Sequence, residues 1–444
     1  MTEIRPQPGP QEDFCSCSAD IVGLGGAAGG GKSFGLLIEA LRHVANPGYG
    51  AVIFRRTNED IRNEGALWDT SAQIYSGMAK PREANLDWTF PSGASISFKG
   101  LQYEKDVYNF QGSQIPFMGW DELPHFTRKQ FFYMISRNRS TCGIRPVIRF
   151  TLNPDPDSWV FELLGPWVDE THPHYGAKPG EIRWFVVIDD EIIWCEEGTE
   201  FAKSISYFPA KVFDNKILMA KDPGYLANLN ALGHEDKQRL LHGLWTALEA
   251  KGALWSRANI DRDRIQLPDL PPLVRRVVGL DPSASVGSDS SSDEAGIVVK
   301  GIDKSGHHYT LADRSGHYSP ADWAKQAIWA FHRYDCSCIV AEKNQGGEMV
   351  KTTIQTIEHV PVKLVHAKQN KEVRADPVSA LSEMGKDHMV GRFPALEGQL
   401  TRWVPNTGMP SPDRLDAKVY ASLELDPTLA KEKKRIQSES RTLA

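Results

Sequence analysis

Short runs of apolar, β-branched and aromatic residues alternate with segments of helical periodicity over the first 160 residues of the chain. Strand-like runs occur at 21–24, 51–55, 94–98 and 147–151, and the segment 34–41 spaces its apolar residues as a helix does. Strands that alternate with helices are typical of a sheet covered by helices. This half of the chain is therefore predicted to be an α/β domain, although 160–235 is less regular.

A second pattern begins near residue 275, with a different order of elements. Strand-like runs at 277–281, 296–300 and 308–311 are followed by a helical segment at 321–334 and a fourth strand at 338–342. This order of elements predicts an RNase H-like domain, in which three strands are followed by a helix, a fourth strand and further helices.

The length of 444 residues also favours two domains, because it exceeds what one ordinary core supports. Lys251-Gly252-Ala253 and a Pro-rich stretch at 267–272 interrupt any regular element. The predicted organisation is a first domain at 1–250, a linker at 251–274, a second domain at 275–430 and a solvated basic tail at 431–444.

Composition narrows the class of protein. Contents of 41% hydrophobic and 24% charged residues are typical of a soluble globular protein. No apolar run approaches the roughly 20 residues that cross a bilayer, and the N-terminus lacks a signal peptide's apolar centre, so no membrane partner is expected. Six sparse cysteines without metal-ligand spacing predict free thiols in a reducing cytoplasm. The net charge of −6 neither indicates nor excludes nucleic-acid binding, which depends on local basic patches.

The residues 26–33 match the phosphate-loop pattern G-x-x-x-x-G-K-[ST] at every fixed position. A strand precedes them and a helix follows, which argues against the alternative of a chance glycine-rich loop. In this pattern backbone N–H groups surround phosphate oxygens, the lysine reaches the β/γ-phosphates and the hydroxyl holds Mg²⁺. The motif predicts that the chain binds and hydrolyses ATP. The predicted binding residues are Gly26, Gly29, Gly30, Gly31, Lys32 and Ser33.

An acidic partner is expected on a neighbouring strand, because Mg²⁺ needs a carboxylate and the attacking water must be oriented. The run 115–122 supplies both, with Asp121 as the metal-side carboxylate and Glu122 as the residue that activates water. Pro116 and Gly119 interrupt the apolar run, so the motif is imperfect. Its position after a well-formed phosphate loop strengthens the prediction.

Other polar residues near these motifs are further candidates. Thr151 and Asn153 follow a strand and are placed to sense the γ-phosphate, with an ordinary Asn-Pro turn as the alternative. Gln11 is a candidate for an adenine contact, with a solvent-exposed side chain as the alternative. Arg139, or Arg137, is a candidate arginine finger in cis or from a neighbouring subunit; the alternative is a basic face that touches DNA or solvent.

Three carboxylates form a second constellation. Asp281 and Glu342 each end a predicted strand, and Asp416 lies at the start of a predicted helix. Such a cluster is costly through mutual repulsion unless divalent cations neutralise it. Two Mg²⁺ or Mn²⁺ ions roughly 4 Å apart can activate water and stabilise a leaving oxygen, the chemistry of phosphodiester hydrolysis. Asp281 would bridge both ions and Asp293 is an outside candidate, although 57 acidic residues make chance triads easy to draw.

Together and in this order, the motifs resemble the large terminase subunit of tailed bacteriophages and prophages, the DNA-packaging motor. Each motif is unspecific by itself, whereas their ordered occurrence over almost the whole chain is highly specific. The phosphate loop lacks the arginine that some relatives carry at a variable position, so no cis arginine is expected there. The segments that carry the resemblance are 25–33, 110–113, 119–126, 136–140, 151–154, 212–215, 240–245, 279–282, 341–347, 371–377 and 413–417.

The resemblance implies an N-terminal P-loop ATPase domain of the ASCE type and a C-terminal RNase H-like nuclease domain. It implies ATP-driven translocation of double-stranded viral DNA into a procapsid, and cleavage of concatemeric DNA by two metal ions. The implied partners are the small terminase subunit, the portal protein and further copies of the chain, in a ring expected to be a pentamer, with a monomer in solution. The implied location is the cytoplasm of the infected or lysogenic bacterial host.

Two other functions remain as alternatives. A DNA-repair helicase–nuclease would use the same two chemistries but should carry further helicase motifs, which are not found between 160 and 270. A non-catalytic capsid-assembly component with relic sites would not need to retain Lys32 and all three acids.

Overall fold

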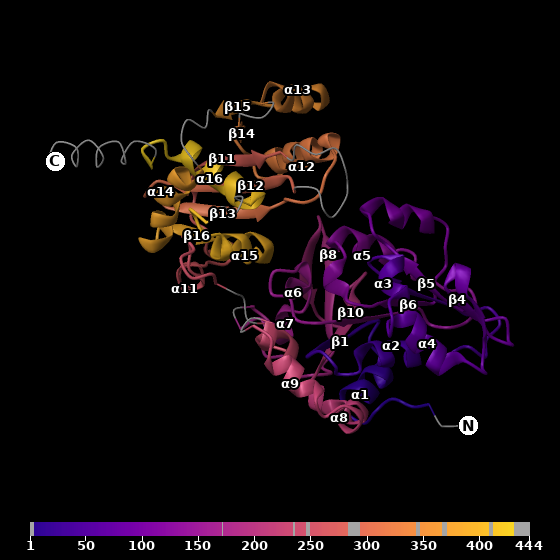
Figure 1. The fold of residues 1–444 in the computed structure, drawn as a ribbon. Helices are drawn as coiled ribbons and strands as arrows, with labels where there is room; N and C mark the ends of the chain where they lie inside the picture. Colours follow the sequence, from indigo (N-terminus) through magenta and orange to yellow (C-terminus); the bar gives the residue numbers. More distant parts are fainter. Residues whose placement is uncertain are drawn as a thin grey trace. The chain divides into compact units, whose positions relative to one another are not determined.

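The computed structural model describes residues 4–170, 172–233, 236–245, 249–282, 294–342, 347–365, 371–407 and 412–429. The chain divides into two compact units, 1–247 and 248–444, each built around its own sheet (Figure 1). All six cysteines are free, as predicted. Within the described ranges, no helix has the length and apolar character needed to cross a membrane.

The first unit contains a sheet in the order β3-β4-β5-β2-β6-β7-β1-β10-β8-β9. The inner strands from β5 to β10 are parallel, and an antiparallel hairpin adjoins each side. Because parallel strands end at one edge, the residues after β1, β6 and β7 lie together there. The strands are β1 (Ile21–Gly26), β2 (Gly50–Arg55), β3 (Lys80–Arg82), β4 (Asp87–Thr89), β5 (Ser95–Gly100), β6 (Phe117–Trp120), β7 (Val147–Leu152), β8 (Arg183–Ile188), β9 (Glu191–Cys195) and β10 (Lys203–Ala210).

Helices cover both faces of this sheet. Apolar residues of α1, α2 and α4 form one core cluster with the strands, and those of α5 and α6 form another. Local signals explain several starts: Thr57 and Asp60 form a capping box that begins α3. The helical segments are α1 (Pro10–Ser16), α2 (Lys32–Ala40), α3 (Asn58–Arg62), α4 (Leu67–Tyr75), η1 (Glu83–Asn85), η2 (Glu104–Phe110), η3 (Leu123–His125), α5 (Arg128–Ile135), α6 (Trp159–Leu163), α7 (Gly165–Val168), η4 (Val212–Asp214), α8 (Lys216–Lys221), α9 (Tyr225–Asn230) and η5 (Lys237–Leu241).

The four strands predicted in the first half are present as β1, β2, β5 and β7, and the predicted helix is α2. The structure also has β10, which the sequence did not reveal within the irregular segment 160–235. Pro209 and the polar side chains of Ser204 and Ser206 break the apolar pattern of this strand. β10 is nevertheless mostly buried beside β1, where Ser204 Oγ donates to Asp20 Oδ2 at 2.8 Å.

The second unit contains a sheet in the order β15-β14-β11-β12-β13-β16. β11, β12 and β13 are antiparallel, while β14 and β15 continue parallel to β11. This arrangement confirms the predicted strands and the α/β class. The strands are β11 (Leu273–Asp281), β12 (Gly296–Asp303), β13 (His308–Asp313), β14 (Ile339–Glu342), β15 (Val362–Val365) and β16 (Asp387–Met389).

Helices also form two apolar clusters with the second sheet, one with α12 and α13 and the other with α11, α14, α15 and α16. α16 lies directly on β11: a Cβ at Gly279 would sit 2.0 Å from the main-chain oxygen of Ala417. This close approach places the first turn of α16 beside the end of β11. The helical segments are α11 (Arg257–Arg262), η6 (Leu267–Asp269), α12 (Pro320–Arg333), α13 (Gly347–Ile357), α14 (Lys371–Glu383), α15 (Pro394–Arg402) and α16 (Asp413–Leu425).

The structure differs from the expected linker at 251–274. These residues belong to the second unit and contain α11, η6 and the first residues of β11. Trp255 and Ile260 are buried in the same core cluster as α15 and α16. Proline and glycine interrupted the periodicity, but the apolar residues between them still anchor this segment. The predicted tail at 431–444 lies outside the described residues.

A buried charged cluster ties α16 to the second sheet. The carboxylate of Asp387 accepts from Lys300 Nζ at 2.7 Å and from Lys418 Nζ at 2.6 Å, and both lysines are fully buried. Burial alone would raise the pKa of Asp387, but the two lysine charges lower it. Burial lowers the pKa of Lys300, and the charge of Lys418 lowers it further. One carboxylate thus compensates two buried amines.

We expect Asp387→Asn to lower the free energy of unfolding by about 3–5 kcal/mol near pH 7, because two buried lysines lose their carboxylate. The stability of the parent chain itself should rise from about pH 7, the folded pKa of Lys300, toward about pH 10. The folded pKa of Lys300 lies below its unfolded value of about 10.4, so between these values the unfolded chain binds more protons and stability rises with pH. Urea denaturation across this range tests the prediction. The fully exposed Asp335 supplies the control Asp335→Asn, and equal losses in both variants would contradict it.

Candidate active sites

The predicted phosphate loop connects β1 to α2 at the carboxyl edge of the parallel strands. Gly31, the residue before α2, has a φ of 75°, a left-handed conformation that glycine adopts without strain. The unpaired N–H groups at the start of a helix favour an anion. Residues 26–33 thus have the strand–loop–helix context that the motif requires.

Lys32 lies across this loop. Its Nζ donates to two main-chain carbonyls of the loop and, at 3.0 Å, to Oδ1 of Asn153. Burial lowers the pKa of Lys32 to about 8, although the charges of Asp121 and Glu122 act in the opposite direction. The structure therefore brings Lys32 together with Asn153 and with both predicted acids.

Asp121 directly follows β6 and is 1% exposed. Its Oδ1 accepts from Ser33 Oγ at 2.8 Å and from Thr151 Oγ1 at 2.6 Å. Thr151 can join the two motifs because β7 lies between β1 and β6. Mg²⁺ prefers oxygen ligands such as hydroxyl and carboxylate groups, so Ser33 and Asp121 fit the role of metal ligands predicted for them.

Glu122 is held at both its main chain and its side chain. Its N–H donates to Thr151 Oγ1 at 3.0 Å, and its φ of 60° is left-handed. Its Oε2 lies 2.9 Å from Arg55 Nη2 and 3.1 Å from His125 Nδ1. Burial raises the pKa of Glu122, but the His125 hydrogen bond and the Arg55 charge outweigh it and the net shift is downward.

Gln11 supports the phosphate loop from α1. It is 5% exposed, and its Nε2 donates to the main-chain oxygen of Gly31 at 2.7 Å. Asn215 supports the same loop from the later segment, donating to the main-chain oxygen of Gly29 at 2.7 Å. Gln11 is therefore not the solvent-exposed residue considered as an alternative, and its contact with adenine stays a prediction.

The candidate arginine fingers are occupied elsewhere in the first unit. Arg139 donates to the main-chain oxygens of Gly112 at 3.0 Å and Ser113 at 3.2 Å. The Arg137 guanidinium lies over the Tyr133 ring, 5.4 Å from its centre. Within the described ranges, neither arginine is brought to the phosphate loop of its own chain. Action from a neighbouring subunit stays a prediction.

The second candidate site lies at the end of two adjacent strands. Asp281 and Glu342 are the last residues of β11 and β14, which are parallel neighbours that pair Leu280 with Ala341. The two acids therefore leave the sheet at the same edge. Asp416 lies in the first turn of α16 and is 1% exposed.

These acids share one electrostatic environment. Burial raises the pKa of Asp281 well above its usual range, and three nearby negative charges raise it further, those of Asp416, Asp413 and Glu342. Lys371 opposes this effect, with its Nζ 2.5 Å from Asp416 Oδ2. The three predicted acids therefore lie close enough for Asp416 and Glu342 to raise the pKa of Asp281. Asp413 is a further acid that acts on Asp281 in the same way.

The ligand types of this cluster suit divalent cations, since Mg²⁺ and Mn²⁺ prefer carboxylate oxygens. Three of the acids, Asp281, Glu342 and Asp416, act on the single lysine Lys371 and raise its pKa. In the present conformation, no three His, Cys, Asp or Glu side chains in the described part of the chain are arranged to hold a metal ion. The segments 283–293, with Asp293, and 343–346 lie outside the described residues. The residue types thus suit the predicted ions, but the described side chains do not form a complete set of metal ligands in this conformation.

Glu342 is oriented by two side chains. The Tyr420 hydroxyl donates to Glu342 Oε2, and Arg374 Nη2 lies 3.9 Å from Oε1. The Arg374 guanidinium also lies over the Tyr420 ring, 5.1 Å from its centre. Tyr420 follows Asp416 by four residues, so both lie on the same side of α16.

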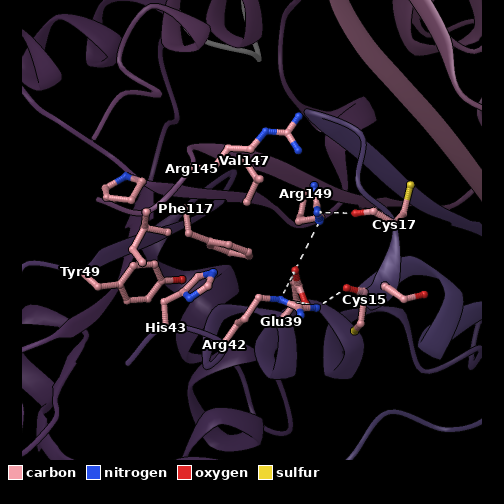
Figure 2. A pocket seen from close by; sticks show the side chains of 13 residues that line it. Cys15, Cys17, Glu39, Arg42, His43, Tyr49, Phe117, Arg145, Val147 and Arg149 are labelled. Atoms are coloured by element: carbon pink, nitrogen blue, oxygen red, sulfur yellow. Dashed lines mark hydrogen bonds and ion pairs between the residues drawn. The ribbon is translucent and has the colours of Figure 1, made fainter. Parts of the chain in front are cut away.

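A cavity of about 210 Å³ lies elsewhere in the first unit (Figure 2). Its lining includes the first residues of β6 and β7, and Glu39 and Arg42 near the end of α2. Its guanidinium groups already donate to main-chain oxygens, that of Arg42 to Cys15, that of Arg145 to Ser18 and that of Arg149 to Cys17. Because the phosphate loop follows the other end of the parallel strands, this cavity is not part of the candidate ATPase site.

Sequence reasoning assigned no role to several residues that contact predicted acids, among them Arg55, Lys371 and Tyr420. A charged residue at the end of a buried strand was the available signal for Arg55. Four-residue spacing from Asp416 was the signal for Tyr420. Lys371 had no signal beyond its place in a motif.

Comparison with solved structures finds large terminase chains at low identity. The large terminase of a thermophilic bacteriophage is 13% identical, with a TM-score of 0.40 and coverage of 95% of this chain and 99% of that chain. The HK97 bacteriophage large terminase is 12% identical, with a TM-score of 0.42 and coverage of 95% of each chain. The large terminase ATPase domain of Thermus phage P74-26 is 12% identical, with a TM-score of 0.35 and coverage of 55% of this chain and 100% of that chain. No curated protein sequence matches the chain significantly.

Two family models match the chain in sequence order. Residues 24–262, more than half of the chain, match "Terminase large subunit, T4likevirus-type, N-terminal". Residues 278–425 match "Terminase RNaseH-like domain". The matches correspond to the two sheets described above and confirm the predicted combination of an ATPase-type domain and an RNase H-like domain. The chain therefore belongs to the large terminase family.

Proposed function

We propose that this chain hydrolyses ATP to move double-stranded viral DNA into a procapsid and cuts concatemeric DNA. One observation supports the proposal: in each unit, candidate residues gather where neighbouring parallel strands of its own sheet end. In the first unit these residues follow β1, β6 and β7; in the second they end β11 and β14. Membership of the large terminase family supports the packaging role.

In the proposed ATPase centre, Lys32 binds the β/γ-phosphates while loop N–H groups surround the phosphate oxygens. Glu122 orients and deprotonates the attacking water. Thr151 and Asn153 sense the γ-phosphate, a role supported by their hydrogen bonds to Asp121 and Lys32. Mg²⁺ held by Ser33 and Asp121 would neutralise charge on the transferred phosphoryl group.

In the proposed nuclease centre, Asp281, Glu342 and Asp416 would hold the divalent ions. Mg²⁺ or Mn²⁺ there would supply an activated water and stabilise the leaving oxygen of a phosphodiester. Tyr420 and Arg374 keep Glu342 oriented, and Lys371 offsets the excess negative charge. Grip on DNA is expected to be mostly to backbone phosphates and largely independent of sequence.

The proposed assembly is a ring of copies of this chain at the portal protein, acting in the host cytoplasm, with the small terminase subunit choosing the cleavage site. ATP would lie between neighbouring subunits, and Arg139 or Arg137 would reach the nucleotide of the adjacent copy. The contacts of Arg139 with Gly112 and Ser113 support action in trans, because they place its guanidinium outside the phosphate loop of its own chain.

We expect Glu122→Gln to lower ATP turnover by about 10²–10⁴-fold, because glutamine cannot accept a proton from water. Its similar shape should leave nucleotide affinity nearly unchanged. Phosphate release and binding of a fluorescent ATP analogue separate the two effects. Glu162→Gln, which removes a surface carboxylate paired with Arg128, is the matched control. Turnover within about twofold of the parent chain would exclude Glu122 as the base.

A further inference from the structure

Arg414 connects the first turn of α16 to two strands of the second sheet. Its Nε and Nη2 donate to the two carboxylate oxygens of Glu294 at 2.9 Å and 2.8 Å, and its Nη1 donates to Asp313 Oδ2 at 2.6 Å. Glu294 lies just before β12, and Asp313 ends β13. The side chains of Arg414 and Asp313 are only 12% and 6% exposed, so this ion pair is largely buried. A bidentate guanidinium–carboxylate pair fixes direction as well as distance.

These partners lie next to the acid cluster of the candidate nuclease site. β11 and β12 are antiparallel and pair Asp281 with Gly296, so β12 begins where β11 ends. α16 approaches this point closely, because a Cβ at Gly296 would sit 2.0 Å from the main-chain oxygen of Asp413. Asp413 and Asp416 are three positions apart and therefore lie on the same side of the helix. A shift of the first turn of α16 would move both acids relative to Asp281.

The same network covers the start of the helix. Pro412, the residue before α16, has no side-chain acceptor that could cap the first N–H groups. Gln399 supplies one instead: its Oε1 accepts from the main-chain N–H of Arg414 at 3.1 Å, and its Nε2 donates to Glu294 at 3.2 Å. The attachment of α16 to the sheet is thus centred on Arg414 and Glu294.

Repulsion between the acids opposes this placement. Beyond the effect of burial, the charges of Asp416 and Asp413 raise the pKa of Asp281, as like charges do when they lie close together. Without a metal ion, this repulsion pushes the first turn of α16 away from the end of β11. Lys371 offsets part of it through its contact with Asp416. Arg414 resists it differently, by attaching the same turn to β12 and β13.

We propose that Arg414 is a positioning residue that holds Asp413 and Asp416 on the side of Asp281, an inference that rests on the proposed nuclease function. A divalent cation then has to reorient side chains but not the helix. Arg414 also engages both carboxylate oxygens of Glu294, so it withholds this neighbouring acid from the metal ligands. Residues that orient metal ligands from outside are typically worth about 10–100-fold in metal affinity or activity.

The test is calorimetric titration of the full-length Arg414→Gln chain with Mn²⁺. We expect affinity to fall by about 10–100-fold, because the first turn of α16 is no longer fixed. The Mn²⁺ concentration that gives half-maximal plasmid cleavage should rise by the same factor. Charge alone predicts the opposite sign, since loss of a cation and release of Glu294 and Asp313 would attract Mn²⁺ more strongly. Unchanged or tighter binding by the folded variant would overturn the inference.

Arg275→Gln is the matched control, since Arg275 Nη2 lies 2.6 Å from Glu424 Oε1 at the other end of the same helix. It should leave Mn²⁺ affinity unchanged. If Arg414→Gln is too unstable to assay, Arg414→Lys decides, because it keeps the charge and loses the bidentate pair. Weaker Mn²⁺ binding by this variant supports the positioning role, and affinity equal to that of the parent chain overturns it. A parent chain that bound no Mn²⁺ would instead contradict the proposed nuclease function.

Discussion

Lys32→Ala should lower ATP turnover by at least about 100-fold, the cost of removing one preorganised cationic or hydrogen-bond donor from a transition state. Lys32 lies across the phosphate loop and contacts Asn153, so its amine is already at the site where negative charge would develop. Alanine leaves the loop glycines and Ser33 in place. Phosphate release at saturating ATP measures the effect.

Two comparisons separate this loss from unfolding or weak binding. Lys129→Ala removes an exposed lysine of the same unit, paired with Glu104, and should leave turnover unchanged. Thermal melting of both variants should match the parent chain. A Lys32→Ala protein that still turns over ATP within about threefold of the parent would place the catalytic lysine elsewhere.

Asp281→Asn should lower metal-dependent DNA cleavage by on the order of 10³-fold, because the predicted bridging carboxylate loses its charge. The substitution keeps the side-chain shape and relieves repulsion from Asp416, Asp413 and Glu342. It should therefore raise the stability of the metal-free chain while reducing its affinity for Mn²⁺. Supercoiled plasmid relaxation measures cleavage, and calorimetric titration with Mn²⁺ measures binding.

Asp335→Asn again serves as the control, since this fully exposed aspartate lies in the same unit. It should change neither cleavage nor Mn²⁺ binding. If Asp281→Asn bound Mn²⁺ as tightly as the parent chain and still cut DNA, the acid cluster would not be the nuclease centre.

Periodicity predicted the elements that carry the candidate sites, because strongly apolar strands are visible without tertiary information. β1, β7, β11 and β14 all occur where the sequence indicates them. β10 was missed because its burial depends on pairing with β1, which lies far away in the sequence. The segment 251–274 was misjudged for a related reason: Trp255 is buried by residues of the second unit that lie far away in the sequence.

In the candidate sites, too, local sequence motifs were predictable, whereas contacts that depend on tertiary packing were not. Lys32, Ser33 and Asp121 belong to motifs with fixed spacing, so sequence reasoning found them, and the structure brings them together. Arg55 was assigned no role because its place beside Asp121 depends on the order of β2 and β6 in the sheet. Lys371 similarly reaches Asp416 only through the packing of α14 and α16.

The most direct test of two independent phosphate-chemistry centres is a cross-comparison of Lys32→Ala and Asp281→Asn, with ATP hydrolysis and plasmid cleavage both measured on each full-length variant. Lys32→Ala should lose hydrolysis and keep Mn²⁺-dependent cleavage, while Asp281→Asn should keep hydrolysis and lose cleavage. Loss of both activities in both folded variants would contradict the presence of two independent centres.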